Sequence, residues 1–371
     1  MKGKPVIYPV NMTATYKFES SDDLIDVVQN RTGYIYSRWD NPSIMEVEKE
    51  MAALEGYDHA AAFSSGMAAI TTSVFSHMKS GDRILSTREV YGGTYELFTK
   101  VLPNMGIEVV MVNCWDIEKL TSEIEKGIDV LYLESPTNPL LRVMDVAPLV
   151  KLAHAKGATV MLDSTFASPV NQHPVDLGVD VTIHSATKFI GGHHDITGGF
   201  TCSNEKSFWK IWDYRKILGG VMDPMTGFLA QRGLKTLDIR MERQNNNAME
   251  IALFLEAHPS INSVHYPGLE SHPDHEVAKR TLKGYGGMMS FEVNSDFNGT
   301  KSVMDRLKVI KLATSLGGVT SLANQPITNT HASLSPEDRK KAGVAENLVR
   351  LSVGIEPVAT LIDDLAQALK I

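Results

Sequence analysis

The chain has 371 residues and a formal net charge of −8, and 43% of its residues are hydrophobic. A chain of this length can bury a large core and usually forms two or three domains. The acidic balance argues against a basic surface for nucleic acid or for membranes.

The cysteine content and the N-terminal sequence indicate the cellular compartment in which we expect the protein. Cys114 and Cys202 are the two cysteines, too few for a disulfide framework and not spaced as a CxxC pair. The start lacks the apolar run of a signal peptide, and no stretch is apolar enough to span a bilayer. We therefore expect a cytoplasmic protein that binds neither nucleic acid nor membranes.

Residues 1–40 show no clean period and carry an aromatic, cationic segment that contains Tyr36 and Arg38. An arm of this kind, with little core of its own, is typical of a segment that packs on another subunit. A local aromatic cluster within its own domain is the alternative. From Ser43 a helix is predicted, because apolar residues recur at helical spacing and Gly56 stands at the C-cap position.

A Ser-Ser-Gly turn then leads into an Ala-rich helix. This order places the backbone N–H groups of Gly66 and Met67 at a helix N-terminus, where anions bind well. Ser and Gly commonly open helices, so an ordinary helix start is the alternative.

Strands and helices alternate through the next hundred residues. The predicted strands are residues 82–87, 107–112, 129–134, 159–164 and 180–185, and the helices between them include Tyr95–Leu102, Ile117–Ile124 and Val146–His154. This alternation predicts an α/β fold with a mostly parallel sheet covered on both faces. Ligands of such sheets bind at the carboxyl ends of the strands, where Tyr91, Asn138, Asp163 and Lys188 are found.

Lys188 differs from an ordinary surface lysine. It follows a strand, lies between Ser185, Thr187 and a glycine-rich turn, and has no neighbouring charges in sequence. A lysine in such surroundings loses its proton readily and can attack a carbonyl. The pattern predicts a Schiff-base lysine, and a lysine that merely ends a strand is the alternative.

Beyond residue 235 the units become shorter, with a charged helix at Arg232–Arg243, another at Asn246–Ala257 and a last helix at Ala359–Leu369. We predict three parts from this change. These are an N-terminal arm at residues 1–40 that contacts a neighbouring subunit, a large domain at 41–235 and a smaller C-terminal α/β domain at 236–371.

Eight motifs in order carry a family resemblance: YSRWDNP, SSGMAAI, VYGGTY, ESPTNP, DSTFASP, SATKFIGGHHDITGG, SLGG and RLSVGIE. From about residue 5 to its end the chain resembles the Cys/Met-metabolism family of pyridoxal-phosphate (PLP) enzymes. The resemblance implies PLP-dependent transferase fold type I, with a large mostly parallel sheet domain and a smaller C-terminal domain. It also implies a homotetramer, a dimer of dimers whose active sites are shared between subunits.

The resemblance assigns roles to residues of this sequence. Lys188 matches the lysine that binds PLP and moves protons, and Asp163 matches the aspartate paired with the pyridine nitrogen. Tyr91 matches the tyrosine that stacks on the cofactor ring. The residues assigned to the phosphate are Gly66, Met67, Ser185 and Thr187, with Tyr36 and Arg38 from the neighbouring subunit. Those assigned to the substrate side are Arg350 for the α-carboxylate, Asn138 near the ring oxygen and Ser315 near the lysine.

The implied function is that of a PLP-dependent carbon–sulfur lyase, a γ-lyase of the methionine, homocysteine or cystathionine type. The alternative is a γ-replacement transferase such as cystathionine γ-synthase or O-acetylhomoserine sulfhydrylase, and a β-lyase is a further possibility. In each case Lys188 removes the Cα proton of an amino-acid substrate.

Three positions and one loop depart from the patterns of individual family members. Glu96 stands where the cystathionine enzymes usually have an arginine for the distal carboxylate. Thr314 replaces a glutamate, Gly93 replaces the cysteine of methionine γ-lyases, and the loop Gln325–His331 differs from the usual run. Two facing carboxylates repel each other, so Glu96 favours a substrate without a distal carboxylate. A solvent-facing Glu96 is the alternative.

Two other functions are compatible with parts of the sequence. His184, His193, His194 and Asp195 resemble the ligands of a hydrolytic metal site. Adjacent side chains such as His193 and His194 usually point apart, so we expect no metal. A scaffold protein of the same fold without catalysis is the other alternative, and the complete set of Lys188, Asp163, Tyr91 and Arg350 disfavours it.

Overall fold

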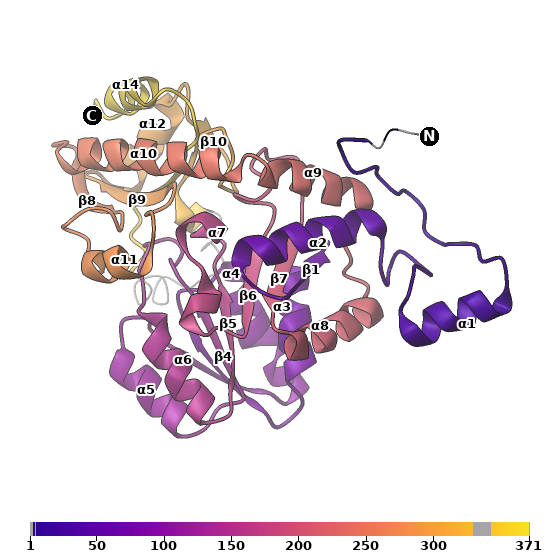
Figure 1. Cartoon of the computed structure of the whole chain (residues 1–371). Helices are drawn as coiled ribbons and strands as arrows, with labels where there is room; N and C mark the ends of the chain where they lie inside the picture. The colour runs from indigo at the N-terminus through magenta and orange to yellow at the C-terminus, as the bar shows by residue number, and fades with distance from the viewer. Residues whose placement is uncertain (1–2, 4, 329–342, 371) are drawn as a thin grey trace.

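The computed structural model describes residues 3, 5–328 and 343–370, which form two β-sheets surrounded by helices (Figure 1). The larger sheet has seven strands in the order β1-β7-β6-β5-β4-β2-β3. Its strands are β1 (His59–Phe63), β2 (Arg83–Thr87), β3 (Glu108–Val112), β4 (Val130–Glu134), β5 (Thr159–Asp163), β6 (Val181–Ser185) and β7 (Gly199–Ser203). Strands β2 to β6 are parallel, and β7 is antiparallel to both of its neighbours. The prediction of a mostly parallel sheet is confirmed.

Helices cover both faces of this sheet. They are α2 (Pro42–Glu55), α3 (Gly66–His77), α5 (Ile117–Glu125), α6 (Val146–Ala155), α8 (Glu205–Leu218) and α9 (Pro224–Leu234). Successive residues of β4 show why its sequence is continuously apolar. Tyr132 packs in a cluster with residues of α3 and α8, whereas Leu131 packs in a cluster with residues of α5 and α6. Both faces are therefore buried.

The second sheet has five strands in the order β10-β11-β12-β9-β8. They are β8 (Ile261–His265), β9 (Met288–Val293), β10 (Lys311–Leu312), β11 (Leu322–Asn324) and β12 (Leu348–Ser352). The helices of this part are α10 (Leu237–Glu256), α11 (His275–Thr281), α12 (Phe297–Arg306) and α14 (Val358–Ala368). A smaller α/β unit at the C-terminal end is thus present, while the boundaries at residues 40 and 235 remain predictions.

Three local predictions were wrong. The arm contains a helix, α1 (Ser21–Asn30), capped by Ser20 and without a buried residue. Helix α10 runs unbroken where two helices were predicted, because its residues 237–256 include no Gly or Pro and the break falls at Lys235 and Thr236 instead. The helix expected at Tyr95–Leu102 starts earlier, as α4 (Gly92–Glu96), and continues as a π-helical turn over Leu97–Val101.

The N-terminal arm extends away from the body of the chain, and α1 lies at the periphery (Figure 1). Several of its apolar side chains are exposed: Val6, Ile7, Tyr8, Met12, Leu24, Ile25, Val28 and Tyr36. Apolar patches of this kind usually mark a surface that binds another protein. Among the described residues, no helix has the length and apolar character needed to cross a bilayer.

Candidate active site

A cavity of about 660 Å³ lies at the carboxyl ends of β4, β5 and β6, which end at Glu134, Asp163 and Ser185. Its size is typical of a site for a small molecule. The predicted residues that line it are Gly66, Met67, Tyr91, Asn138, Asp163, Ser185, Thr187, Lys188, Ser315 and Arg350. The structure thus brings together residues that are up to 284 positions apart in the sequence, from Gly66 to Arg350.

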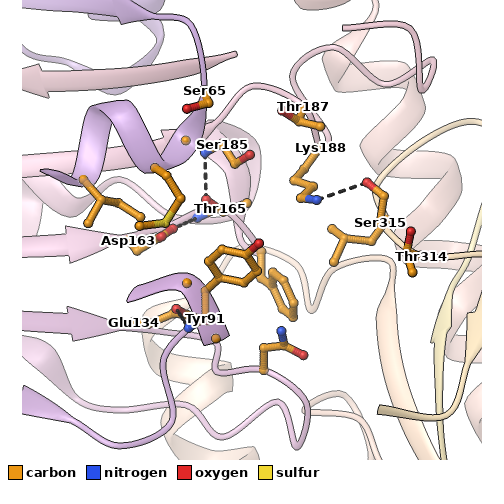
Figure 2. A pocket seen from close by; sticks show the side chains of 18 of the residues that line it. Ser65, Tyr91, Glu134, Asp163, Thr165, Ser185, Thr187, Lys188, Thr314 and Ser315 are labelled. Carbon is orange, nitrogen blue, oxygen red and sulfur yellow. Dashed lines mark hydrogen bonds between the residues drawn. The ribbon is translucent and has the colours of Figure 1, made fainter. Parts of the chain in front are cut away.

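Lys188 reaches into the cavity and donates a hydrogen bond from Nζ to Ser315 Oγ at 3.0 Å (Figure 2). Burial lowers the pKa of its amine to about 8, the positive charge of Arg350 acts in the same direction, and Asp163 acts against them. In the part of the chain that the structure describes, no carboxylate forms an ion pair with this amine. Lys188 is therefore a good nucleophile near neutral pH.

Asp163 ends β5 and is held by Thr165. Its Oδ1 accepts the backbone N–H of Thr165 at 3.0 Å, and Thr165 Oγ1 accepts the backbone N–H of Ser185 at 2.9 Å (Figure 2). Burial raises the pKa of the Asp163 carboxyl above its ordinary value of 3.8. A buried carboxylate gains most from a cationic partner, so the site favours a ligand that brings positive charge to this position.

Tyr91 projects into the cavity and is fixed by Glu134 (Figure 2). The carboxyl oxygen Oε2 of Glu134 accepts the backbone N–H of Tyr91 at 2.7 Å. Glu134 also lies opposite Asp163 in the register of β4 and β5. Burial raises the pKa of Glu134 well above its usual range, and the nearby Asp163 raises it further. Sequence reasoning assigned no role to Glu134 or Thr165, because their contacts depend on strand pairing.

The N-terminus of α3 forms one wall of the cavity. Ser65 caps this helix by accepting the backbone N–H of Ala68 at 3.0 Å, so the helix begins at Gly66. A Cβ on Gly66 would lie only 2.9 Å from the Cβ of Ser185. Glycine therefore lets Ser185 approach the helix end. Backbone N–H groups and hydroxyls gathered in this way suit a phosphate group.

Arg350 lies on β12 with only 2% of its surface exposed. Its guanidinium donates to Asn138 Oδ1 at 3.1 Å and to the backbone oxygen of Ser315 at 3.3 Å. Burial lowers its pKa to about 10, and among the described residues no carboxylate forms an ion pair with it. A buried guanidinium bonded only to neutral oxygens is a strong site for a ligand carboxylate.

Glu96 also lines the cavity, and its carboxylate lies 2.8 Å from Lys100 Nζ one turn further on. Its side chain is about half exposed at 46%, so it faces both the cavity and solvent. Gly93 and Thr314 line the same cavity. Of the loop Gln325–His331, residues 329–331 lie outside the described residues.

Tyr36 and Arg38 do not line the cavity of their own chain. Both belong to the arm, where Tyr36 is 42% exposed and Arg38 donates to the backbone oxygen of Lys216. Their predicted role in a neighbouring subunit remains a prediction.

Two of the histidines considered as metal ligands bond to other groups. His184 is buried and its Nε2 lies 2.5 Å from Glu55 Oε1, while His193 Nδ1 lies 2.7 Å from the backbone oxygen of Gly191. Within the described ranges, no three His, Cys, Asp or Glu side chains are placed together as metal ligands.

Comparisons with known proteins agree on one family. The profile described as "Cys/Met metabolism PLP-dependent enzyme" matches residues 2–370. Cystathionine gamma-lyase of Dictyostelium discoideum is 41% identical over 98% of this chain and 92% of its own. L-methionine gamma-lyase of Fusobacterium nucleatum subsp. polymorphum is 39% identical over 98% and 93%. Among solved structures, cystathionine gamma synthase from Xanthomonas oryzae pv. oryzae in complex with aminoacrylate and cysteine matches with a TM-score of 0.94. Its sequence is 34% identical, and the match covers 98% of this chain and 92% of that one.

Proposed function

Because the chain belongs to the Cys/Met metabolism family of PLP-dependent enzymes, we propose that Lys188 binds the cofactor in an enzyme that cleaves the Cγ–S bond of a sulfur amino acid. The family identifies the chain as a PLP-dependent enzyme of sulfur amino-acid metabolism. The proposed role of Lys188 and the proposed reaction rest on one observation. The amine of Lys188 shares a cavity with Asp163 and Arg350.

The cavity fits pyridoxal phosphate on the chemistry of its donors. The amine of Lys188, whose pKa is lowered to about 8, suits the aldehyde, and the buried carboxylate of Asp163 suits a protonated ring nitrogen. The close approach that Gly66 allows brings the start of α3 and the Ser185 hydroxyl together for the phosphate. Bound pyridoxal phosphate supplies an aldehyde for the amine and a ring that withdraws electrons from the substrate Cα.

The residues of the chain would act in sequence on a bound amino acid. Arg350 holds the α-carboxylate with two N–H groups, which places Cα within reach of Lys188. Lys188 Nζ then removes the Cα proton, and Ser315 Oγ keeps the amine oriented. Tyr91 packs on the ring, and its hydroxyl serves as a second proton donor. Lys188 would pass the Cα proton to the bound cofactor and then accept a second proton from Cβ, after which the Cγ–S bond could break and the departing sulfur would take up the proton of the Tyr91 hydroxyl.

The rate of cofactor attachment is expected to depend on pH. Attachment requires a neutral amine, and the pKa of Lys188 is lowered to about 8. Attachment to cofactor-free protein should accelerate as pH rises, reach half of its maximal rate near pH 8 and level off about one pH unit higher. Stopped-flow absorbance after mixing with pyridoxal phosphate at pH 6 to 10 measures this. In Arg350→Met the loss of a nearby positive charge should move the midpoint to higher pH. A midpoint near 10.5 in the native protein contradicts the prediction.

Glu96 leads us to propose a substrate that lacks a distal carboxylate, such as methionine or homocysteine. The carboxylate lines the cavity, where it would repel the second carboxylate of cystathionine. Lys100 offsets part of this charge, because it pairs with Glu96 at 2.8 Å. The repulsion is therefore enough to disfavour such substrates rather than to exclude them.

Glu96→Arg is expected to raise kcat/KM for cystathionine by roughly tenfold, since a repulsion becomes an attraction. Its effect on methionine should be small. Glu96→Gln is the matched control, which removes the negative charge without adding a positive one and should give an intermediate value. Efficient cystathionine turnover by the native protein, combined with a loss in Glu96→Arg, would show that this account of Glu96 is wrong.

We propose that the active protein is a homotetramer built from two dimers, with the arm lying on the neighbouring subunit. The exposed apolar side chains of α1 and of the segment before it support this. Tyr36 and Arg38 would then reach the phosphate bound in the neighbouring subunit. Buried, unpaired Cys114 and Cys202 fit the cytoplasmic location that we propose.

A mixing experiment tests the shared site. Lys188→Ala and Arg38→Ala chains are unfolded together and refolded, so that half of the dimers contain one chain of each kind. Each mixed dimer then has one intact site if Arg38 acts on the neighbouring subunit, and about one quarter of native activity returns. If Arg38 acts only within its own chain, the mixture is no more active than the sum of the separate variants.

A product assay tests the proposed reaction. The holoenzyme is given methionine, homocysteine, cystathionine, cysteine and O-acetylhomoserine separately, and 2-oxobutyrate, pyruvate and thiol are measured. We expect 2-oxobutyrate and thiol from methionine and homocysteine. Products that form only when a thiol and an O-acyl ester are supplied together would identify a γ-replacement enzyme instead, and pyruvate as the main product would identify a β-lyase.

A further inference from the structure

Helix α10 packs against β8 and β9 of the second sheet and against α14 (Figure 1), and one of its faces carries three buried polar side chains. They are Arg240, Gln244 and Asn247, with 4%, 0% and 1% of their surface exposed. The spacing of four and then three residues places them on the same face of the helix. Their side-chain nitrogens donate almost entirely to backbone oxygens of segments that carry the site.

Arg240 holds the segment that follows Lys188. Its guanidinium donates to the backbone oxygens of Phe189 at 2.7 Å and Ile190 at 3.3 Å, and to that of Gly233 at 2.8 Å. A Cβ on Gly192, whose φ is +71°, would lie 2.2 Å from an Arg240 nitrogen. The turn after Lys188 is therefore built closely around this guanidinium. Among the described residues no carboxylate forms an ion pair with Arg240.

Gln244 joins the two segments on the other side of the site. Its Nε2 donates to the backbone oxygen of Gly318 at 2.9 Å and to that of Val353 at 3.1 Å. Gly318 comes three residues after Ser315, and Val353 comes three residues after Arg350. The oxygen of the Gln244 amide has no hydrogen-bond partner in the structure. A buried oxygen without a partner is unfavourable. The amide at position 244 is therefore explained by the two hydrogen bonds that its nitrogen donates.

Asn247 continues the series one turn later, donating to the backbone oxygens of Gly354 at 3.1 Å and Glu356 at 2.9 Å. The larger sheet carries Lys188 beyond β6, and the second sheet carries Arg350 on β12. Among the described strands, none of one sheet pairs with a strand of the other, so strand pairing alone does not set the distance between these residues. Helix α10 contacts both segments directly.

We propose that Arg240 and Gln244 are positioning residues, which hold the Lys188 turn and the Ser315 and Arg350 segments at the separation that the reaction needs. The inference rests on the proposed function, in which Arg350 binds the carboxylate and Lys188 removes the adjacent Cα proton. A displacement of about 1 Å between such groups can lower the rate by a factor on the order of 10². Arg240 and Gln244 lie one helical turn apart. Arg240 fixes the Lys188 turn to α10, and Gln244 fixes the Ser315 and Arg350 segments to the same helix.

The test uses Gln244→Met, which keeps the length of the side chain, and Arg240→Met, which keeps an unbranched apolar stem; both remove the hydrogen-bond donors. Asn246→Ala, on the exposed side of α10, is the matched control. Gln244→Met should raise KM for the amino acid and lower kcat/KM by roughly tenfold to hundredfold, with the visible absorption of the bound cofactor unchanged. Arg240→Met should instead slow cofactor attachment and move its pH midpoint, and Arg240→Lys should restore part of both. Asn246→Ala should match the native protein.

Hydrogen exchange on the cofactor-free protein gives a readout that does not depend on activity. Arg240→Met should speed exchange at Gly191 and Gly192, whose N–H groups bond to Ala186 and Lys188 oxygens. Gln244→Met should speed exchange at Val319 and Ile355, which bond to Gly192 and Val319 oxygens. Unchanged exchange in these peptides together with unchanged KM and attachment overturns the proposal, even if the melting temperature falls. A native protein that binds no cofactor refutes the proposed function, and exchange then still decides whether α10 holds these segments.

Discussion

Lys188→Ala is expected to lower turnover by a factor on the order of 10⁴ and to remove the visible absorption of the lysine-bound cofactor. The reason is that one nitrogen has two tasks in the proposed mechanism, where the amine both binds the cofactor and removes the Cα proton. No other lysine can take over these tasks, because Lys188 is the only lysine among the described residues that line the cavity. Steady-state kinetics and an absorption spectrum of the cofactor-loaded variant measure both effects.

Two controls sharpen this result. Lys151→Ala removes a lysine that is exposed on α6 and should leave kinetics and spectrum unchanged. Added methylamine can enter the space left by the Lys188 side chain, and it should restore part of the turnover of Lys188→Ala. Full activity of Lys188→Ala without an added amine would contradict the role assigned to this residue.

Asp163→Asn is expected to lower kcat by a factor on the order of 10³, while the protein still folds. The substitution keeps the size of the side chain and its hydrogen bond from Thr165 but removes the negative charge. Without that charge a ring nitrogen at this position no longer stays protonated, and the ring withdraws fewer electrons from Cα. Cofactor affinity should also fall, because the buried ion pair is lost.

Kinetics and equilibrium dialysis of cofactor measure these two effects of Asp163→Asn separately. Thr165→Val is the comparison, since it leaves the charge of Asp163 and the backbone N–H that bonds to it, and removes a hydroxyl that bonds to Asp163 and to the backbone N–H of Ser185. We expect a smaller loss from it than from Asp163→Asn. Native kcat in Asp163→Asn would show that the carboxylate does not pair with the ring.

The central strands of the larger sheet could be predicted because burial leaves a direct trace in sequence. Strands buried on both faces read as apolar runs, and all five predicted strands agree with the structure within one residue at each end. Strands β1 and β7 were not predicted. The first is HAAAF, whose alanines do not favour a strand, and the second starts at Gly199 after another glycine. Their antiparallel pairing, rather than local preference, makes them strands.

The site residues at the carboxyl ends of the strands could be predicted individually, because polar and titratable residues follow the predicted strands directly in the sequence. Their mutual contacts could not. The bond from Tyr91 to Glu134 spans 43 positions, and that from Arg240 to Phe189 spans 51. Helix α10 also shows what the sequence pattern could not predict, because the break expected between residues 243 and 246 falls within one continuous helix, whose polar residues Gln244 and Asn247 are buried against backbone oxygens.

The most direct test of the account is chemical labelling of the cofactor-loaded native protein. Reduction with borohydride makes the bond between an amine and the cofactor permanent, and digestion with mass spectrometry then locates it. We predict a pyridoxyl group on the peptide that contains Lys188, with loss of the visible absorption on reduction. A label on a different lysine, or no label in a protein that turns over substrate, would contradict the account.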